Sequence, residues 1–433
     1  MKDFLKKYSY IIIALLGILF LRAYYLNMAF QQGSFSHERS YNNGDASHYL
    51  KIGKNIADFH VYSDNNSNVP TEIATWRPPI WPFVLSNLFY FSDHPSTLII
   101  LKFLLELSLI LFALLKIIKH LSLNAIYILP FLIILIEPQY VKYSITFLSE
   151  SFAAILMLLL AIFFIALNNN KRYHVTIPIL SALLTLIHPV SVFFILAIFI
   201  TYLFYNLKSN FKITILHGLL FSIMVLTWPI RNHLTFNKGV YLTASQGATF
   251  SKGWNEKVST EFTNVDGDLA NEDMNLKYVD STLINDVNHS VIKLSKVYTA
   301  GTRSFINQIS FGKKLKIVFK KLKSNFNPFP EKPKPGILES LSIVFRIVYL
   351  IVLIQLILRF FQKKRFSFNS NKDKAYLIVI AVFIGQILMS SYIYTGLRFN
   401  AIYSLTMLCC FMIINLKTIN SMLDNIYKRL QNR

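Results

Sequence analysis

The apolar run YSYIIIALLGILFLRAYYLNM, residues 8–28, decides the fold class. It is long enough for an α-helix to cross a hydrocarbon layer of about 30 Å. Three lysines precede it, it exceeds the apolar length of a typical signal peptide, and it lacks a small-residue cleavage site. The run therefore predicts an uncleaved membrane-spanning helix with a cytoplasmic N-terminus.

Apolar runs of similar length recur along the chain. Apolar residues make up 54% of its 433 residues and charged residues only 15%, where an average soluble protein has roughly a quarter charged. We therefore predict an all-α membrane protein, a bundle of about ten transmembrane helices. Besides the first, the predicted spans are residues 97–119, 122–139, 144–167, 174–189, 191–205, 213–230, 339–361, 374–394 and 398–416.

The formal net charge of +22 follows membrane topology. Lys and Arg lie mainly at the ends of apolar runs and in short connections, which argues against a basic face for nucleic acid. The positive-inside rule assigns these connections and both termini to the cytoplasm. Two long polar segments, 29–96 and 231–338, are then predicted on the outside.

These assignments divide the chain into three parts. Residues 1–230 form an N-terminal transmembrane module that contains the outer loop 29–96, residues 231–338 form a small outer subdomain, and residues 339–433 form a C-terminal module with a basic cytoplasmic tail.

Two shorter segments outside the spans predict surface helices. Ile80–Phe91 is apolar but too short to span, so we interpret it as an interfacial helix. Gly312–Phe326 alternates lysines with apolar residues, which predicts a basic amphipathic helix on the membrane surface.

The outer loop begins with the stretch Gly44-Asp45-Ala46-Ser47-His48-Tyr49. A carboxylate in such a loop can accept a proton from an attacking hydroxyl group. Tyr49 follows Asp45 by four residues and shares its face if the stretch is helical. The structural alternative is that Asp45 caps a helix N-terminus after Gly44.

Trp76-Arg77-Pro78-Pro79 follows in the same loop. The guanidinium group of Arg77 presents a planar set of donors that suits a phosphate, and the nearby Trp76 and Trp81 offer flat faces for a sugar ring. The alternative is that Trp76 and Arg77 anchor the loop at the membrane interface.

Four further candidates lie at the same predicted level. Glu150 stands near the outer end of a span, where a charge is expected to face the bundle interior or its aqueous mouth. Arg231 and Asn232 close the span 213–230, and Arg398 opens the last span. Arginines at one interface indicate an anionic ligand such as a phosphate, and headgroup anchoring is the alternative.

Other ionisable or reactive residues are interpreted as structural. Lys102 and Glu106 lie one helical turn apart, so we predict that they pair with each other. We interpret His188 as a polar residue whose hydrogen bonds are made within the protein. Cys409 and Cys410 are adjacent in an apolar run, so we expect small core side chains and no disulfide.

Several short motifs resemble the GT-C-fold polytopic glycosyltransferases, in the family of bacterial protein O-mannosyltransferases and lipid A aminoarabinose transferases. They are Asp45-x-x-x-Tyr49, Arg77-Pro78-Pro79-x-x-Pro82, Ser149-Glu150, Pro229-x-Arg231-Asn232, the polar segment Val240–Asn255, and Gly396-Leu397-Arg398-Phe399. Their order covers most of the chain, although each motif is short.

The resemblance implies a transferase that moves a sugar from a polyprenyl-phosphate donor to an acceptor hydroxyl of a lipid, glycan or protein. The reaction would occur on the outer face of the bacterial cytoplasmic membrane, with Asp45 as the base. The remaining candidates, Tyr49, Trp76, Arg77, Glu150, Arg231, Asn232 and Arg398, would bind substrate. We expect no cofactor. Many family members carry a second acid after the aspartate, where this chain has Ala46, which disfavours a divalent metal. Asp58, Asp64 and Glu72 are the acids that could compensate.

Two other functions stay open. A transporter or flippase of a lipid-linked saccharide would carry internal repeats and broken helices at mid-membrane, whereas the charged candidates here gather at one interface. An O-antigen polymerase or ligase would share the lipid-linked donor but lack the aspartate after the first span.

Overall fold

The computed structural model describes residues 2–36, 40–41, 44–121, 128–167, 172–206, 211–260, 272–287, 289–326, 337–362, 366–367, 370–393 and 397–431. All regular structure within these ranges is helical. The predicted all-α fold class is therefore confirmed for this part of the chain.

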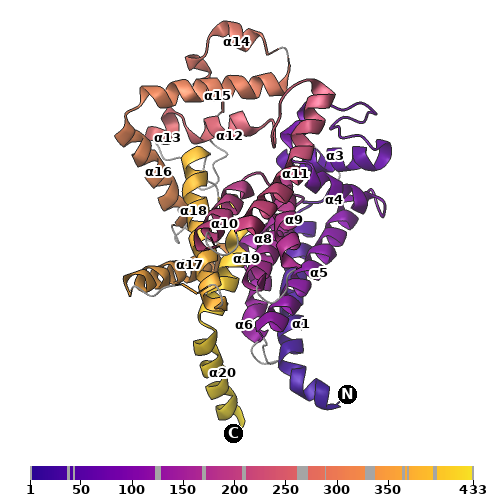
Figure 1. Ribbon diagram of the computed structural model, residues 1–433. Coiled ribbons are helices and arrows are strands. Elements are labelled where there is room, and N and C mark those ends of the chain that lie inside the picture. The colour runs from indigo at the N-terminus through magenta and orange to yellow at the C-terminus, as the bar shows by residue number, and fades with distance from the viewer. Residues whose placement is uncertain are drawn as a thin grey trace.

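The bundle is built from helices at both ends of the sequence (Figure 1). From the first half come α1 (Lys2–Gln31), α3 (Gly44–Phe59), η1 (Ile73–Trp76), α4 (Ile80–Phe89), α5 (Pro95–Leu121), α6 (Leu129–Leu132), η3 (Ile133–Ile136), α7 (Pro138–Ser144), α8 (Glu150–Ile165), α9 (Tyr173–Ile187), α10 (Ser191–Asn206) and α11 (Phe211–Phe236). From the second half come α17 (Ile337–Phe361), α18 (Asn371–Tyr392), α19 (Leu397–Ile414) and α20 (Leu416–Gln431).

The remaining helices form what we call the polar subdomain. They are α12 (Gln246–Gly253), α13 (Glu256–Thr260), η5 (Glu272–Tyr278), α14 (Ser281–Asn285), α15 (Val291–Gln308) and α16 (Phe311–Phe326). In Figure 1 these helices and α3 lie at one end of the bundle, and both chain termini lie at the other. The first loop and the polar subdomain thus share one side, which we call the subdomain side.

Several helices are long and apolar enough to cross a membrane. Among the described residues these are α5, α11, α18 and the segment Ser342–Phe361 of α17, while α19 and α20 together qualify as a pair bent by 68°. α4, α8, α9 and α10 are apolar but shorter. The predicted number of about ten spans is not confirmed.

The core of the bundle surrounds α8. Every residue of α8 is buried, and α5, α7, α9 and α19 pack against it. A helix that is apolar on all sides is stable in a protein core or in a membrane, and the described part of α8 lies in such a core. The adjacent cysteines Cys409 and Cys410 of α19 are free and fully buried, as predicted.

The predicted span 122–139 is not one continuous helix. Residues 122–127 lie outside the described part, and the rest divides into α6, η3 and α7. Glu137 has the extended backbone angle ψ 121° and caps α7, because its carboxylate accepts a 2.6 Å hydrogen bond from the Tyr140 N–H. Pro138 then occupies the first turn of α7, where its missing N–H costs nothing.

The predicted span 213–230 ends too early. α11 continues through Pro229 to Phe236, so Arg231 and Asn232 lie on a helix rather than in a loop. The buried Trp228 holds this end, because its indole N–H donates to the Leu242 carbonyl oxygen at 3.0 Å.

Candidate functional site

A cavity of about 150 Å³ lies between the bundle and the polar subdomain. The cavity wall is formed by the first loop (residues 29–96), the starts of α8 and α10, the segment after α11, and the junction of α18 and α19. The lining residues include Asp45, Tyr49, Trp76, Arg77, Glu150, His188, Phe193, Thr243, Gln246, Thr249, Tyr392 and Phe399. Five predicted site residues therefore line one cavity: Asp45, Tyr49, Trp76, Arg77 and Glu150.

The start of α3 positions Asp45 and Tyr49. Gly44 adopts φ +65°, a conformation that favours glycine, and begins the helix. Asp45 lies in the first turn, where the helix dipole favours a negative charge. Tyr49 follows one turn later and is buried. The predicted shared face is thus present.

Asp45 and Arg77 form an ion pair in the cavity wall. The Arg77 Nη2 atom lies 2.7 Å from Asp45 Oδ1, and the side chains are 12% and 34% exposed, respectively. The guanidinium carbon of Arg77 also lies 5.4 Å from the centre of the Tyr49 ring. Its Nε atom is buried and has no hydrogen-bond partner among the described residues, so Arg77 retains a donor that the pair does not use.

The backbone around Arg77 is fixed from two sides. The buried Tyr62 donates its hydroxyl hydrogen to the carbonyl oxygens of Arg77 and Pro78, at 2.9 and 3.2 Å. On the other side, Thr243 donates to the Trp76 carbonyl oxygen, and the Ala244 N–H donates to that of Thr75. The segment after α11 therefore fixes the loop that carries Arg77.

Burial determines the charge states beside this ion pair. It raises the pKa of Tyr49 to about 12, so the phenol is a neutral hydrogen-bond donor near pH 7. Burial, and secondly the positive charge of Arg77, lower the pKa of His48. His48 is therefore uncharged at neutral pH.

Glu150 and His188 form a second polar group in the wall. Glu150 is the first residue of α8 and His188 follows α9. The His188 Nε2 atom lies 3.7 Å from Glu150 Oε1, and both side chains are buried. His188 was interpreted as structural, because the sequence does not show that a second helix brings Glu150 to it.

Arg231 and Asn232 are not among the residues that line the cavity in the described part of the chain. Arg231 donates to the Asn232 side-chain oxygen at 2.9 Å, and its guanidinium carbon lies within 5.3 to 5.6 Å of the ring centres of Trp228, Phe236 and Tyr62. Tyr62 thus stands between Arg231 and the loop of Arg77.

Arg398 lies in the first turn of α19, but its side chain and residues 394–396 lie outside the described part. The roles of Arg231, Asn232 and Arg398 in binding stay predictions.

The polar subdomain contributes cavity residues that were not predicted, namely Thr243, Gln246 and Thr249. Gln246 donates to the Tyr392 hydroxyl oxygen at 2.9 Å, and the rings of Phe250 and Tyr392 stack at 4.8 Å. α12 reaches this position through Gly247, because a Cβ there would come within 2.0 Å of the Ser295 carbonyl oxygen of α15. In the sequence, the polar segment Val240–Asn255 was the feature that could have indicated these cavity residues.

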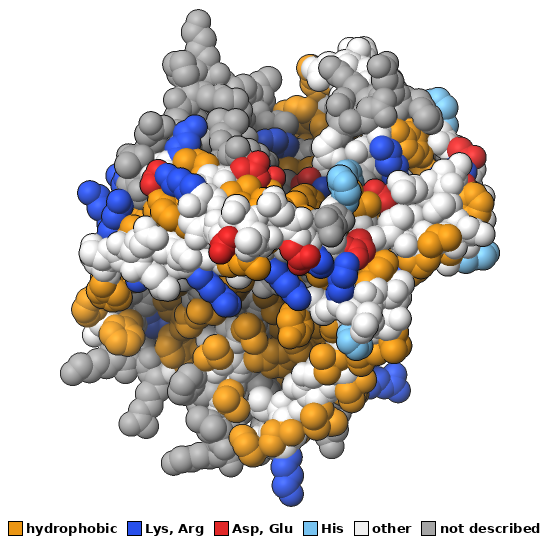
Figure 2. Space-filling model, turned by 90° about the horizontal axis from the view of Figure 1, so that it is seen from above, with side chains coloured by type: hydrophobic (Ala, Val, Ile, Leu, Met, Phe, Trp, Pro, Cys, Tyr) orange, Lys and Arg blue, Asp and Glu red, His pale blue; other side chains and the backbone are white. Residues whose placement is uncertain are grey.

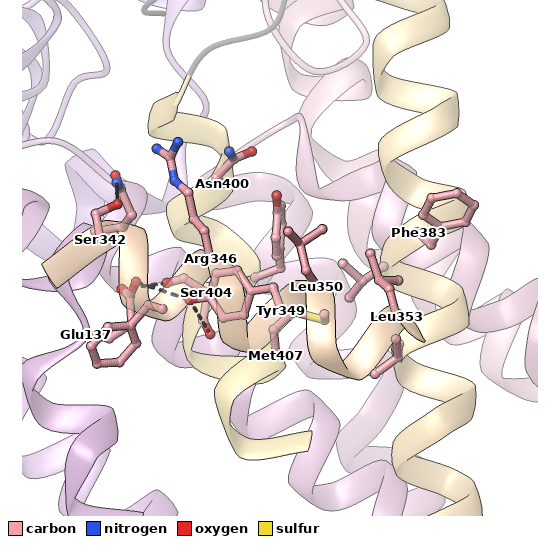
Figure 3. A pocket seen from close by; sticks show the side chains of 15 residues that line it. Glu137, Ser342, Arg346, Tyr349, Leu350, Leu353, Phe383, Asn400, Ser404 and Met407 are labelled. Atoms are coloured by element: carbon pink, nitrogen blue, oxygen red, sulfur yellow. Dashed lines mark hydrogen bonds between the residues drawn. The ribbon is translucent and has the colours of Figure 1, made fainter. Parts of the chain in front are cut away.

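A second, smaller cavity of about 20 Å³ lies between α7, α17, α18 and α19 (Figure 3). Glu137 accepts hydrogen bonds there from Ser404 at 2.8 Å and Tyr349 at 3.2 Å. No predicted site residue is among its described lining residues. Its volume suits about one water molecule, so we interpret it as a polar junction of helices.

No protein-family model, curated protein or solved structure matches the chain. Its classification therefore rests on its own features: the regular structure of the described residues is all helical, and several of these helices could cross a membrane. Within the described residues no three His, Cys, Asp or Glu side chains form a group that could hold a metal ion. The expected independence from metals stays a prediction.

Proposed function

We propose that this chain is a GT-C-type membrane glycosyltransferase that uses a polyprenyl-phosphate sugar as donor. The observation that carries the proposal is the Asp45–Arg77 ion pair in the wall of a cavity between apolar bundle and polar subdomain. An amphipathic donor needs such a place, because its lipid tail must stay in the bilayer while its sugar meets a polar acceptor. We place the reaction on the subdomain side, as the outer face of the bacterial cytoplasmic membrane.

In the proposed reaction, the acceptor hydroxyl oxygen forms a bond to the anomeric carbon while the bond from that carbon to the phosphate oxygen breaks. The electron pair leaves with the phosphate, and the hydroxyl proton goes to Asp45. Such a base contributes about 10²–10⁴-fold to the rate. Direct displacement of this kind inverts the anomeric configuration.

Arg77 is the proposed contact of the leaving phosphate. A guanidinium group has five N–H donors, so Arg77 can keep Asp45 on Nη2 and offer others to the phosphate. Its unused Nε donor supports this role. Preorganised donors stabilise negative charge that develops in the transition state. In this arrangement Arg231 acts indirectly, because it supports Tyr62 behind the loop.

The sugar is assigned to the aromatic part of the wall. Trp76 and Tyr49 line the cavity, and the Trp76 indole N–H is buried without a hydrogen-bond partner among the described residues. An unpaired buried donor is costly unless a ligand satisfies it. A sugar hydroxyl would supply the missing acceptor.

A transporter of lipid-linked saccharides is the second candidate. The chain break at Glu137 between η3 and α7 favours it, because transporters use broken helices around their substrate sites. The two functions differ in chemistry, since a transporter leaves the glycosidic bond intact.

The test uses purified full-length protein in detergent micelles, where transport between compartments is impossible. The protein is incubated with polyprenyl-phosphate sugars and a membrane extract as the acceptor source, and free polyprenyl phosphate is measured. We expect catalytic release from at least one donor. Binding of the donors without release, together with their movement across vesicle membranes, would instead establish the transporter.

A further inference from the structure

Helix α16 presents three different faces around its axis. The first contacts the rest of the protein, because Ile317 and Lys321 are each 1% exposed. Lys321 donates to the carbonyl oxygens of Ser390 and Ile393 at 3.2 and 3.0 Å, and its Nζ atom lies 4.5 Å from a Trp254 ring centre. This face fixes α16 against the last turn of α18.

The attachment sets the level of α16 relative to a membrane. α18 is long and apolar enough to cross a bilayer, and Lys321 contacts the carbonyl groups where α18 ends at Tyr392. Figure 1 shows α16 alongside the part of α18 nearest the polar subdomain. α16 therefore lies where α18 would leave the apolar layer.

The second face of α16 is apolar and exposed. Phe311, Leu315 and Phe319 follow one another at intervals of four residues and thus share a face. Their exposed fractions are 73%, 54% and 76%. On the subdomain side, seen in Figure 2, polar and charged side chains of both signs occupy much of the surface. An exposed apolar row on a basic helix marks an interaction surface.

The third face carries lysines. Lys313, Lys316, Lys320 and Lys323 follow at intervals of three and four residues, adjacent to the apolar face. α16 contains no Asp or Glu. Lys313 lies close enough to Glu256 to affect that carboxyl group, whereas the other three form no ion pair among the described residues. Their charge is available to an external anion.

We infer that α16 rests on the surface of the bilayer on the subdomain side and binds anionic phospholipid headgroups. The rings of Phe311 and Phe319 enter the boundary of the apolar layer, and the lysine row lies on the headgroup phosphates. Adjacent apolar and basic faces are the features that hold an interfacial helix. This inference is independent of the proposed glycosyl transfer.

Charge favours the bilayer over a second copy of the chain. Two α16 helices packed through their apolar faces would bring two rows of lysines together without any acid on either helix. A bilayer that contains phosphatidylglycerol supplies negative charge along the whole length of the row.

The test places an environment-sensitive dye at Phe319→Cys in the full-length protein. Labelling is selective because Cys409 and Cys410 are fully buried. The control dye is at Lys296→Cys, an exposed position on α15. Each protein is reconstituted into phosphatidylcholine vesicles with and without phosphatidylglycerol. Quenching by lipid-borne nitroxide and by aqueous iodide is measured.

We expect nitroxide to quench the dye at position 319 several-fold more than the dye at position 296, and more strongly with phosphatidylglycerol. The triple variant K316Q/K320Q/K323Q should lose the dependence on phosphatidylglycerol. The triple variant K277Q/K293Q/K296Q removes the same charge elsewhere and should keep it. Equal iodide quenching of the dyes at both positions would overturn the inference. Protection of the dye at position 319 that rises only with protein density would also overturn it and would indicate a protein partner instead.

Discussion

Two acid–base pairs with the same 2.7 Å separation have opposite surroundings. Lys102 and Glu106 are both fully buried between α5, α7 and α8, whereas Asp45 and Arg77 open onto the cavity. Lys102 also donates to Ser151 and to the Ser144 carbonyl oxygen, and Ser151 donates to Glu106 at 2.6 Å. The enclosed pair is satisfied by protein groups, while Arg77 keeps an unused donor.

We interpret the enclosed pair as structural and propose that the open pair is functional. A buried charge is tolerated only with full compensation, and removal of one partner exposes the other to the full cost of desolvation. A partly exposed pair contributes little to stability, so its loss should leave the fold largely intact. We therefore expect variants of the two pairs to affect different properties, stability for one and activity for the other.

The largest effect on stability is expected from Lys102→Met. It leaves Glu106 without its cationic partner in the core, at a cost of about 3–5 kcal/mol. Unfolding by SDS titration in mixed micelles measures the change. The double variant K102M/E106L removes both charges and should recover most of the loss. If the double variant were as unstable as Lys102→Met, the pair would not be the unit that stabilises this junction.

Arg77→Gln should have the opposite effect, a small loss of stability and a large loss of activity. The pair with Asp45 is partly exposed, so the loss of unfolding free energy should stay within about 1 kcal/mol. Release of polyprenyl phosphate should fall about 10²–10³-fold, because the leaving phosphate loses its donor. A variant that lost stability but kept its activity would reverse the assignment of the two pairs.

A smaller effect on activity is expected from Trp76→Phe, which keeps an aromatic face but removes the indole N–H. The loss of one hydrogen bond to a neutral sugar hydroxyl costs about 0.5–1.5 kcal/mol. We expect kcat/KM to fall by that amount, roughly 2–10-fold, with unchanged thermal stability. Trp228→Phe is no suitable control, because its N–H bonds Leu242, and we expect it to lower stability instead.

The smallest effect concerns pH and His48. Burial, and secondly the charge of Arg77, lower its pKa below the ordinary value of 6.5. The unfolded chain therefore takes up this proton first, and the stability that the neutral form provides is complete above pH 6.5 and declines as the pH falls. His48→Gln should reduce the decline of the melting temperature between pH 8 and pH 5. An unchanged decline would remove His48 from the account.

The sequence predicted the parts of the fold that depend on local hydrophobicity. α9, α10 and α18 lie within a few residues of the predicted ranges 174–189, 191–205 and 374–394, since long apolar runs leave few alternatives. The break at Glu137 lies near the predicted end of the span 122–139 and has a local cause, because the residue before a proline is disfavoured in the helical conformation. What the sequence does not show is the set of groups that bind the Glu137 side chain. The carboxylate is held by Ser404 and Tyr349 from α19 and α17.

The candidate site was predictable where its residues are close in sequence, share a helix or, like Glu150, carry a charge at the end of an apolar run. Asp45 with Tyr49, and Trp76 with Arg77, were found in this way. Arg231 was predicted at the same end of the bundle as Arg77. A sequence indicates how far along a helix a residue lies, but not which side chain separates two residues. Here Tyr62 lies next to Arg231. His188 was missed as a partner of Glu150 because His188 follows α9 whereas Glu150 begins α8.

The central claim, that Asp45 removes the acceptor proton in this cavity, is tested most directly by comparing Asp45→Asn with Asp58→Asn. Both aspartates lie on α3, both pair with a cation, and both are 34% exposed, but Asp58 is not among the described cavity residues. In single-turnover release of polyprenyl phosphate, Asp45→Asn should be slower than wild type by about 10²–10⁴-fold, and Asp58→Asn should match wild type. Equal rates for the two variants would contradict the claim.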